Sequence, residues 1–310
     1  SMTVQQPEYL PDRWRQMAAF ANKMTAEGLD VKNQIAPRPI GILLGLTATL
    51  NPFAVTNTYR SIANLPLAER VAKMKDPDIR RRIIAEHGSG NHEGIILEIT
   101  TGFHKMFAME DPVNYEPSPE RSLAGLAKAT GRTPHDIAYD MLLQRDGNQL
   151  FYMPLFNWAH ENLNDTREML LAPRSLIGLS DAGAHCGAIS DGSFSTTMLA
   201  LWGRDRTRGE KLPIELLVHH ITQRTASHVG WMDRGVLAPG LLGDVNVINM
   251  DTLAAHPPQI VHDLPAGGRR LMQTASGYKY TVKTGTVTFE NGAHTGELPG
   301  GLVRGAQSAS

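Results

Sequence analysis

The stretch Ser175-Leu-Ile-Gly-Leu-Ser-Asp181-Ala-Gly-Ala-His185-Cys-Gly187 determines how the fold of this chain is interpreted. Residues 176–180 are apolar or small and predict a buried β-strand that runs into the carboxylate of Asp181. Small residues follow it and leave room for a ligand to approach. In α/β folds the catalytic groups lie at the C-terminal ends of the strands. The stretch therefore predicts an α/β protein in which Asp181 is a general base or metal ligand, or else caps a turn.

Three further residues are candidates for contact with a substrate. His185 follows the aspartate at the same predicted strand end, and His160 follows the apolar strand 150–156, so both are expected on one face. Arg38 stands between two prolines, and this rigid mounting suits a bidentate grip on a carboxylate. The structural alternatives are a backbone hydrogen bond for His185 and a salt bridge or surface position for Arg38. Cys186 has no identifiable catalytic partner and is interpreted as a buried spectator.

Outward from this stretch, strands and helices alternate up to about residue 235. Because strands 150–156 and 176–180 are apolar and joined by a helix, they are expected to be neighbours in a parallel sheet. Residues 88–147, with capping residues before two prolines, predict a largely helical insert. Other predicted strands cover 29–36 and 95–100, and other predicted helices cover 12–28, 66–75, 76–87, 195–203 and 213–224.

The pattern changes to all-β after Gly235. Strands are expected at 244–250, 278–283 and 286–290, the last two around a Thr284-Gly285 turn. The sequence thus predicts two domains, an α/β body over 1–235 and a small β module over 236–310.

Composition excludes several classes of protein. The 310 residues carry 30 Lys and Arg against 31 Asp and Glu, so no basic surface for nucleic acid or anionic membranes is expected. No apolar run is long enough to predict a membrane span. The single cysteine excludes an internal disulfide and a CxxC zinc site, and favours a reducing, cytoplasmic compartment.

Motifs for other cofactors are missing from the sequence. It has no GxGxxG or GxxxxGK[ST] phosphate loop, which argues against a dinucleotide or NTP enzyme. It also has no H-x-H, H-x-x-x-H or H-E-x-x-H pattern. His219 and His220 are adjacent on a predicted helix, face apart and cannot ligate one metal together, so one is expected in the core and one in solvent.

At this point the sequence resembles a known family. Gly178-Leu-Ser-Asp181-Ala-Gly-Ala-His185 is similar to the last-strand motif of the amidohydrolase superfamily, in the branch of N-acyl-D-amino-acid deacylases (D-aminoacylases). The helix that follows, the return into the β module and the closing segment also resemble this family, over residues 222–230, 233–248, 282–290 and 295–300. Residues 12–171 are similar only in the order of their elements.

The resemblance implies a metal-dependent (β/α)₈ hydrolase, usually with zinc, that cleaves the amide C–N bond of an N-acyl amino acid. Asp181 would take a proton from the attacking water and deliver it to the leaving amine, close to the metal. The fold expected for this chain is the C-terminal part of such a TIM-type barrel, about strands 6–8, with the helical insert and a small β-sandwich-type module.

The departures from the family pattern lead to further expectations. The first-strand H-x-H, the bridging residue of a middle strand and the histidine of the fifth strand are absent, and Gly192 stands where D-aminoacylases carry a substrate-binding arginine. Relatives have Tyr-Pro-Tyr where this chain has Pro37-Arg38-Pro39, so Arg38 is the candidate substitute. The chain is therefore expected to act on a small molecule together with a missing N-terminal half or as a homo-oligomer.

Two other functions stay open. A truncated barrel that buries its open strand edges against a partner would be a non-catalytic binding or assembly protein. A hydrolase of the same superfamily acting on a cyclic amide or imide would share every motif described above.

Overall fold

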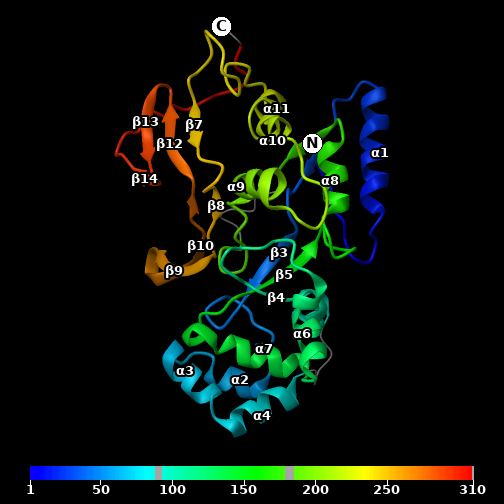
Figure 1. Cartoon of the computed structure of the whole chain (residues 1–310), viewed down its shortest axis with the longest axis vertical. Coiled ribbons are helices and arrows are strands. Elements are labelled where there is room, and N and C mark those ends of the chain that lie inside the picture. The colour runs from blue at the N-terminus through cyan, green and yellow to red at the C-terminus, as the bar shows by residue number, and fades with distance from the viewer. Residues whose placement is uncertain (88–92, 179–184, 309–310) are drawn as a thin grey trace.

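The computed structural model describes residues 1–87, 93–178 and 185–308, so Asp181 lies outside the described residues. Figure 1 shows the helices α2, α3, α4 and α7 at one end of the long axis, with the strands β3, β4 and β5 above them. At the other end, α1 and α8 lie on one side and the C-terminal β strands on the other.

Three short strands form a parallel sheet in the order β1 (Met2–Thr3), β2 (Asn33–Ile35), β6 (Ser175–Ile177). Ile35 is in register with Ile177, so β2 and β6 end side by side. The strands predicted at 29–36 and 176–180 are thus present, although each is shorter than expected.

A second sheet has the order β3 (Ile40–Leu44), β5 (Phe151–Phe156), β4 (Phe107–Ala108), and every pair in it is antiparallel. The expectation that β5 and β6 are parallel neighbours is therefore wrong. The physical reason is that both faces of β5 are covered, Phe151 and Met153 by one core and Tyr152 by another. An apolar run reports burial on both faces, but it does not report which strand lies beside it.

The predicted helices around the parallel sheet are present. Helix α1 begins after Asp12, as expected, but the Asp12 side chain makes no capping hydrogen bond. Helix α10 buries His220 while His219 stays exposed, as expected. One core joins four of these helices, α1, α8, η4 and α10, to β2, with Trp202 and Leu217 fully buried in it. Their bounds are α1 (Arg13–Ala26), α8 (Asn164–Leu171), α9 (Phe194–Thr197), the π-helix η4 (Met198–Asp205), α10 (Ile214–Ile221) and α11 (Gln223–His228).

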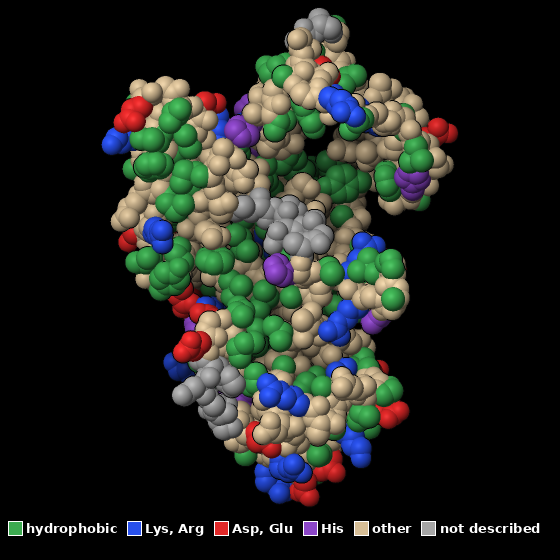
Figure 2. Space-filling view, turned by 180° about the vertical axis from the view of Figure 1, so that it is seen from behind, with side chains coloured by type: hydrophobic (Ala, Val, Ile, Leu, Met, Phe, Trp, Pro, Cys, Tyr) green, Lys and Arg blue, Asp and Glu red, His purple; other side chains and the backbone are tan. Residues whose placement is uncertain are grey.

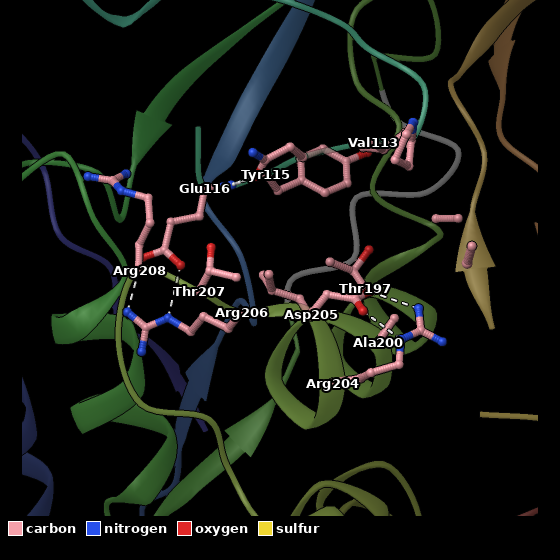
Figure 3. A pocket seen from close by; sticks show the side chains of 15 residues that line it. Val113, Tyr115, Glu116, Thr197, Ala200, Arg204, Asp205, Arg206, Thr207 and Arg208 are labelled. Atoms are coloured by element: carbon pink, nitrogen blue, oxygen red, sulfur yellow. Dashed lines mark hydrogen bonds and ion pairs between the residues drawn. The ribbon is translucent and has the colours of Figure 1, made fainter. Parts of the chain in front are cut away.

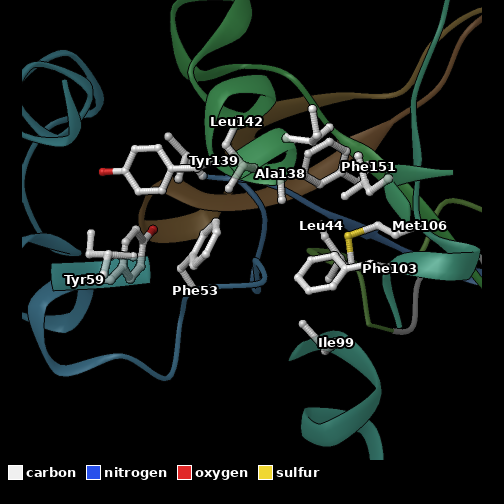
Figure 4. Close-up of a cluster of buried hydrophobic side chains, with 14 of the residues drawn as sticks. Leu44, Phe53, Tyr59, Ile99, Phe103, Met106, Ala138, Tyr139, Leu142 and Phe151 are labelled. Carbon is white, nitrogen blue, oxygen red and sulfur yellow. The ribbon is translucent and has the colours of Figure 1, made fainter. Parts of the chain in front are cut away.

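A helical lobe fills the other end of the molecule. The side chains of Asp76 and Thr133 cap α4 and α7 as predicted, since each accepts hydrogen bonds from backbone N–H groups of the first turn. Phe53, Tyr139 and Phe151 belong to its core (Figure 4). The helices are α2 (Asn57–Ile62), α3 (Leu67–Met74), α4 (Pro77–Glu86), α5 (Gly94–Thr101), α6 (Leu123–Thr130) and α7 (Pro134–Leu142).

The strand expected at 95–100 is wrong, because these residues form helix α5. Ile95 and Leu97 are exposed whereas Ile99 is buried, so only part of the apolar run meets the core. A short apolar run fits a buried helix and a buried strand equally well, which is why the sequence pattern failed here.

After residue 235 the structure is all-β, as predicted. The sheet of four antiparallel strands has the order β14-β13-β12-β7, and Leu271 of β10 packs with Leu43 and Tyr152 of the body. The strands are β7 (Val245–Ile248), β8 (Ala254–Ala255), β9 (Gln259–Leu264), β10 (Gly268–Met272), β11 (Ala275–Ser276), β12 (Tyr278–Lys283), β13 (Thr286–Glu290) and β14 (Ala293–His294).

The chain is a mixed α/β protein whose strands fall into separate small sheets. Within residues 1–87, 93–178 and 185–308, none of these sheets closes into a barrel, and β8–β11 and β9–β10 form two-stranded pairs beside the four-stranded sheet. The predicted part-barrel, sandwich-type module and domain boundary at 235 remain predictions.

The surface differs from one end of the molecule to the other. Figure 2 shows charged side chains gathered on the helical end and hydrophobic side chains across the middle of the back face. In the part of the chain that the structure describes, no helix has the length and apolar character needed to cross a membrane.

Candidate functional site

The ends of β2 and β6 define the site at which the predicted chemistry is centred. The N–H of Gly178 donates to the carbonyl of Ile35 over 3.0 Å, so the pairing continues to the last residue before the undescribed segment 179–184. Because parallel strands end at one edge, the segments that follow them, 36–39 and 185–191, meet there. The structure thus brings Arg38 to the segment that carries His185.

The Arg38 side chain is buried at this edge and already has a carboxylate partner. Its Nη2 lies 3.1 Å from Oδ1 of Asp191, whose side chain is 1% exposed, and donates to the Ser190 carbonyl over 2.8 Å. The guanidinium carbon lies 3.9 Å from the centre of the Tyr115 ring and 4.6 Å from that of Phe194. The structural alternative for Arg38, a salt bridge, is therefore present, and its contact with a substrate stays a prediction.

Electrostatics keep this arginine charged. Burial opposes the charge, but interaction with Tyr115 and Asp191 outweighs it and raises the pKa of Arg38. Burial also raises the pKa of the Tyr152 phenol, which stays protonated. The cluster therefore consists of one cation, one carboxylate and two aromatic faces, held in the protein interior.

The backbone on both sides of Arg38 is fixed by side chains from distant elements. The Tyr152 hydroxyl on β5 donates to the Pro39 carbonyl over 2.6 Å. The indole N–H of Trp202 in η4 donates to the Pro37 carbonyl over 2.6 Å. The rigidity that the two prolines predict is thus reinforced by two buried hydrogen bonds.

His185 begins a tight turn at the same edge. It is exposed, its φ is 47°, and its carbonyl accepts from the N–H groups of Ala188 over 2.7 Å and Ile189 over 3.0 Å. The turn is joined to the body because Thr49 donates to the Gly187 carbonyl over 3.0 Å. Cys186, expected to be buried, is half-buried. The geometry of Asp181 lies outside the described residues.

His160 belongs to a different cluster. Its Nδ1 lies 2.6 Å from Oδ2 of Asp165, and that oxygen also accepts from Nε2 of Gln6 over 2.7 Å. Burial raises the pKa of Asp165, but hydrogen bonds from His160, Gln6 and Arg15 prevail and lower it. Among the described residues no hydrogen bond or ion pair joins His160 to Arg38 or His185, and the expectation that His160 and His185 share one face stays a prediction.

A cavity of about 300 Å³ is lined in part by Tyr115, one of the two rings that flank Arg38. Figure 3 shows Tyr115 and Val113 across this space from Thr197 and Asp205. The Thr197 hydroxyl is buried and has no hydrogen-bond partner among the described residues. The cavity is thus a small pocket with an aromatic wall, next to the Arg38 cluster.

A second buried ion pair borders the same cavity. Glu116 accepts from Nε of Arg206 over 2.9 Å and from Nη2 over 3.0 Å, and it also accepts from the Leu163 N–H over 2.8 Å. The Arg206 side chain is fully buried. This pair holds the segment before η2 (Pro119–Arg121) against the end of η4.

Sequence reasoning missed Asp191, Tyr115, Glu116 and Arg206. The partners in each ion pair are distant in sequence: Arg38 and Asp191 are 153 positions apart, and Arg206 and Glu116 are 90 apart. No local spacing reports such a contact. The only available signal was Asp191 itself, an acidic residue in an otherwise apolar and small segment after a predicted strand.

The described residues do not by themselves supply the zinc ligands that the resemblance implies. Among the residues that the structure describes, no group of three or more His, Cys, Asp or Glu side chains lies close enough to hold a metal ion. The sequence also lacks an H-x-H pair. A zinc centre normally needs three or four such ligands, so the described residues do not make one.

Comparison with known proteins identifies a family. A family model described as the amidohydrolase family matches residues 4–289. Among curated proteins no match was found. A solved structure described as a D-aminoacylase that defines a novel subset of amidohydrolases is 22% identical, with a TM-score of 0.33, and the match covers 62% of this chain and 36% of that one.

Another solved structure comes from work on the binuclear metal center in D-aminoacylase. It is 17% identical, with a TM-score of 0.45, and the match covers 96% of this chain and 48% of that one. The chain therefore spans less than half the length of these solved structures.

Proposed function

The chain belongs to the amidohydrolase family, and from this premise we propose that it serves in a metal-dependent hydrolase of amide C–N bonds. The match over residues 4–289 carries this proposal. N-acyl amino acids are the proposed substrates, since the last-strand motif around Asp181 resembles that of N-acyl-D-amino-acid deacylases. A cytoplasmic location is part of the proposal, because a single cysteine suits a reducing compartment.

The lack of a zinc-ligand cluster among the described residues determines which part of the enzyme this chain is proposed to supply. Because the described residues supply no ligand cluster, the metal ligands are proposed to come from a second polypeptide segment, such as the half that the resemblance predicts, or from a partner copy. This chain would contribute the edge formed by the ends of β2 and β6, with Asp181 following β6 and Arg38 following β2. That edge and its adjoining cavity are the features of the structure that support a substrate site here.

The step proposed for this chain's own residues is the transfer of one proton by Asp181. Asp181 would accept a proton from the attacking water and pass it to the amine nitrogen as the C–N bond breaks. His185, exposed at the same edge, and His160 remain proposed substrate contacts. No step is assigned to a metal ion here.

Metal content tests where the ligands lie. The chain is purified without added metal and analysed by elemental mass spectrometry, and less than about 0.1 zinc per chain is expected because the ligand set is incomplete. About one zinc per chain would overturn that part of the proposal, since it would place a complete ligand set within these 310 residues.

Substitution of Asp181 tests the activity. In the enzyme that carries the full ligand set, Asp181→Asn should lower kcat for N-acetyl-D-amino acids about 10²- to 10⁴-fold while the unfolding midpoint stays unchanged. Asp78→Asn, at an exposed carboxylate in helix α4 of the helical lobe, is the control and should keep kcat within about twofold. An Asp181→Asn enzyme with full activity would end the proposal.

Two alternatives are separated by the same assays. Preference for a cyclic amide or imide over every N-acyl amino acid would keep the hydrolase and change its substrate. A non-catalytic binding or assembly protein is favoured by one observation, the lack of a ligand cluster among the described residues. That function would show as a stable homo-oligomer that hydrolyses no substrate, even with zinc supplied.

A further inference from the structure

We propose that Arg38 is a positioning residue that fixes the turn at residues 185–191, on which His185 lies. The inference rests on the proposed function only in taking this turn to border the substrate site. It assigns to Arg38 a role in holding the site together, through Asp191 and Ser190, instead of a direct contact with substrate.

The first step is that Arg38 is itself immobile. The carbonyls of Pro37 and Pro39 accept hydrogen bonds from Trp202 and Tyr152, each over 2.6 Å, and both donors are buried. Proline fixes φ on both sides of the arginine. The guanidinium therefore projects from a backbone that has little freedom, which is what a positioning group requires.

The second step is that Arg38 reaches the turn at two consecutive residues. Nη2 donates to the Ser190 carbonyl over 2.8 Å and lies 3.1 Å from the Asp191 carboxylate. Backbone hydrogen bonds also join the turn to the body. Leu43 donates to the Ala188 carbonyl over 2.7 Å, and Leu271 donates to the Cys186 carbonyl over 2.6 Å. Arg38 adds a charged contact at the end of the turn where it leads into α9.

The third step is that the ion pair between Arg38 and Asp191 is buried. Both side chains are nearly inaccessible, at 2% for Arg38 and 1% for Asp191, and the Tyr115 and Phe194 rings flank the guanidinium. A carboxylate in such a place stays ionised only while its cation is present. The pair thus couples the turn to the loop after β2, and a substrate would have to displace Asp191 to reach Arg38.

Cys186 provides a direct test, because it is the single cysteine and lies on the turn. Its thiol lies 3.8 Å from the Arg269 carbonyl, so reaction with 5,5′-dithiobis(2-nitrobenzoate) under native conditions reports opening of the turn. The variant Arg38→Met with Asp191→Leu removes both charges and leaves neither unpaired. It should raise the labelling rate at least tenfold.

The matched control is Arg206→Met with Glu116→Leu, which removes the other buried pair. Its labelling rate should stay within twofold of the parent chain. Equal acceleration in both variants, or none with Arg38→Met and Asp191→Leu, would overturn the proposal, because the turn would then depend on general stability or on backbone contacts alone.

A milder variant decides the question if the double variant does not fold. Tyr152→Phe deletes the hydrogen bond to the Pro39 carbonyl and keeps both charges, and labelling should rise about threefold; an unchanged rate would count against the proposal. Labelling needs neither metal nor substrate. Fast labelling in the variants of a protein that hydrolyses no amide would therefore sustain this inference while the proposed function fails.

Discussion

The two buried arginines differ in how completely they are hydrogen-bonded, although both are nearly inaccessible. Arg206 donates to both carboxylate oxygens of Glu116, and its Nη1 donates to the Glu210 carbonyl over 2.7 Å. Arg38 meets Asp191 and Ser190 through Nη2, whereas its Nε is buried with no hydrogen-bond partner in the described part of the chain. Burial alone therefore does not tell how much an ion pair stabilises the fold.

The difference also separates two roles. In a fully bonded pair such as Glu116–Arg206, the hydrogen bonds and the opposite charge offset the free-energy cost of burying both groups. Such a pair stabilises the packing around it. In the Arg38–Asp191 pair the guanidinium lies against two aromatic rings and its Nε has no hydrogen-bond partner in the described part of the chain, and this pair holds a segment in place. The region near the predicted chemistry has the second kind of pair, and the region bordering the cavity has the first.

The largest expected loss of stability follows from disruption of the Glu116–Arg206 pair. Glu116→Gln leaves Arg206 buried without a countercharge, and the free energy of unfolding should fall by about 4 kcal/mol, as when one partner of a buried pair is removed. Equilibrium unfolding in urea measures this change.

Asp191→Asn is the matched substitution in the other pair. It should cost less, about 2 kcal/mol, because the Ser190 carbonyl and the two aromatic rings still contact Arg38. A larger loss from Asp191→Asn than from Glu116→Gln would reverse the comparison of the two pairs.

The next largest effect is the pH dependence of stability that arises from the buried His220. His220 is fully buried next to Arg224, and burial, together with that like charge, lowers its pKa from 6.5 to about 4. The unfolded chain therefore binds the proton more readily, so stability is retained above pH 6.5 and falls as the pH drops toward 4. Between pH 7 and pH 5 the loss should be about 2 kcal/mol.

Urea unfolding at several pH values measures this loss, and His220→Gln should flatten the dependence over that window. His219→Gln, at the exposed neighbour on the same helix, is the control and should leave the dependence unchanged. An equal flattening by both variants would show that His220 is not its source.

These contacts also mark how far the sequence could predict the structure. Capping patterns and helical periodicity identified α1, α4 and α7, and the Pro37-Arg38-Pro39 element correctly indicated a rigid mounting. These features depend on residues within a few positions of one another. The carboxylate that pairs with Arg38 is 153 positions away, and no local pattern encodes such a contact.

Distance along the sequence also explains why the neighbours of β5 were predicted wrongly. The apolar strand β5 was recognised, but its partners were not. Strand β3 begins a glycine- and threonine-rich stretch for which no element was predicted, and β4 is only two residues long. His160 follows β5 in the chain, and its hydrogen-bond partners are Asp165 and Gln6. Gln6 is 154 positions away in the sequence, so no local pattern could indicate this contact.

The smallest expected effect tests the half-exposed counterpart of the two buried pairs. The His160 side chain is 50% exposed, and Asp165 keeps hydrogen bonds from Gln6 and Arg15 when His160 is removed. His160→Gln should therefore lower the free energy of unfolding at pH 7 by only about 0.5 kcal/mol, since solvent screens the contact. Urea unfolding beside the parent chain measures this difference. A loss as large as that of Asp191→Asn would show that half-exposure of the His160 side chain does not weaken this contact.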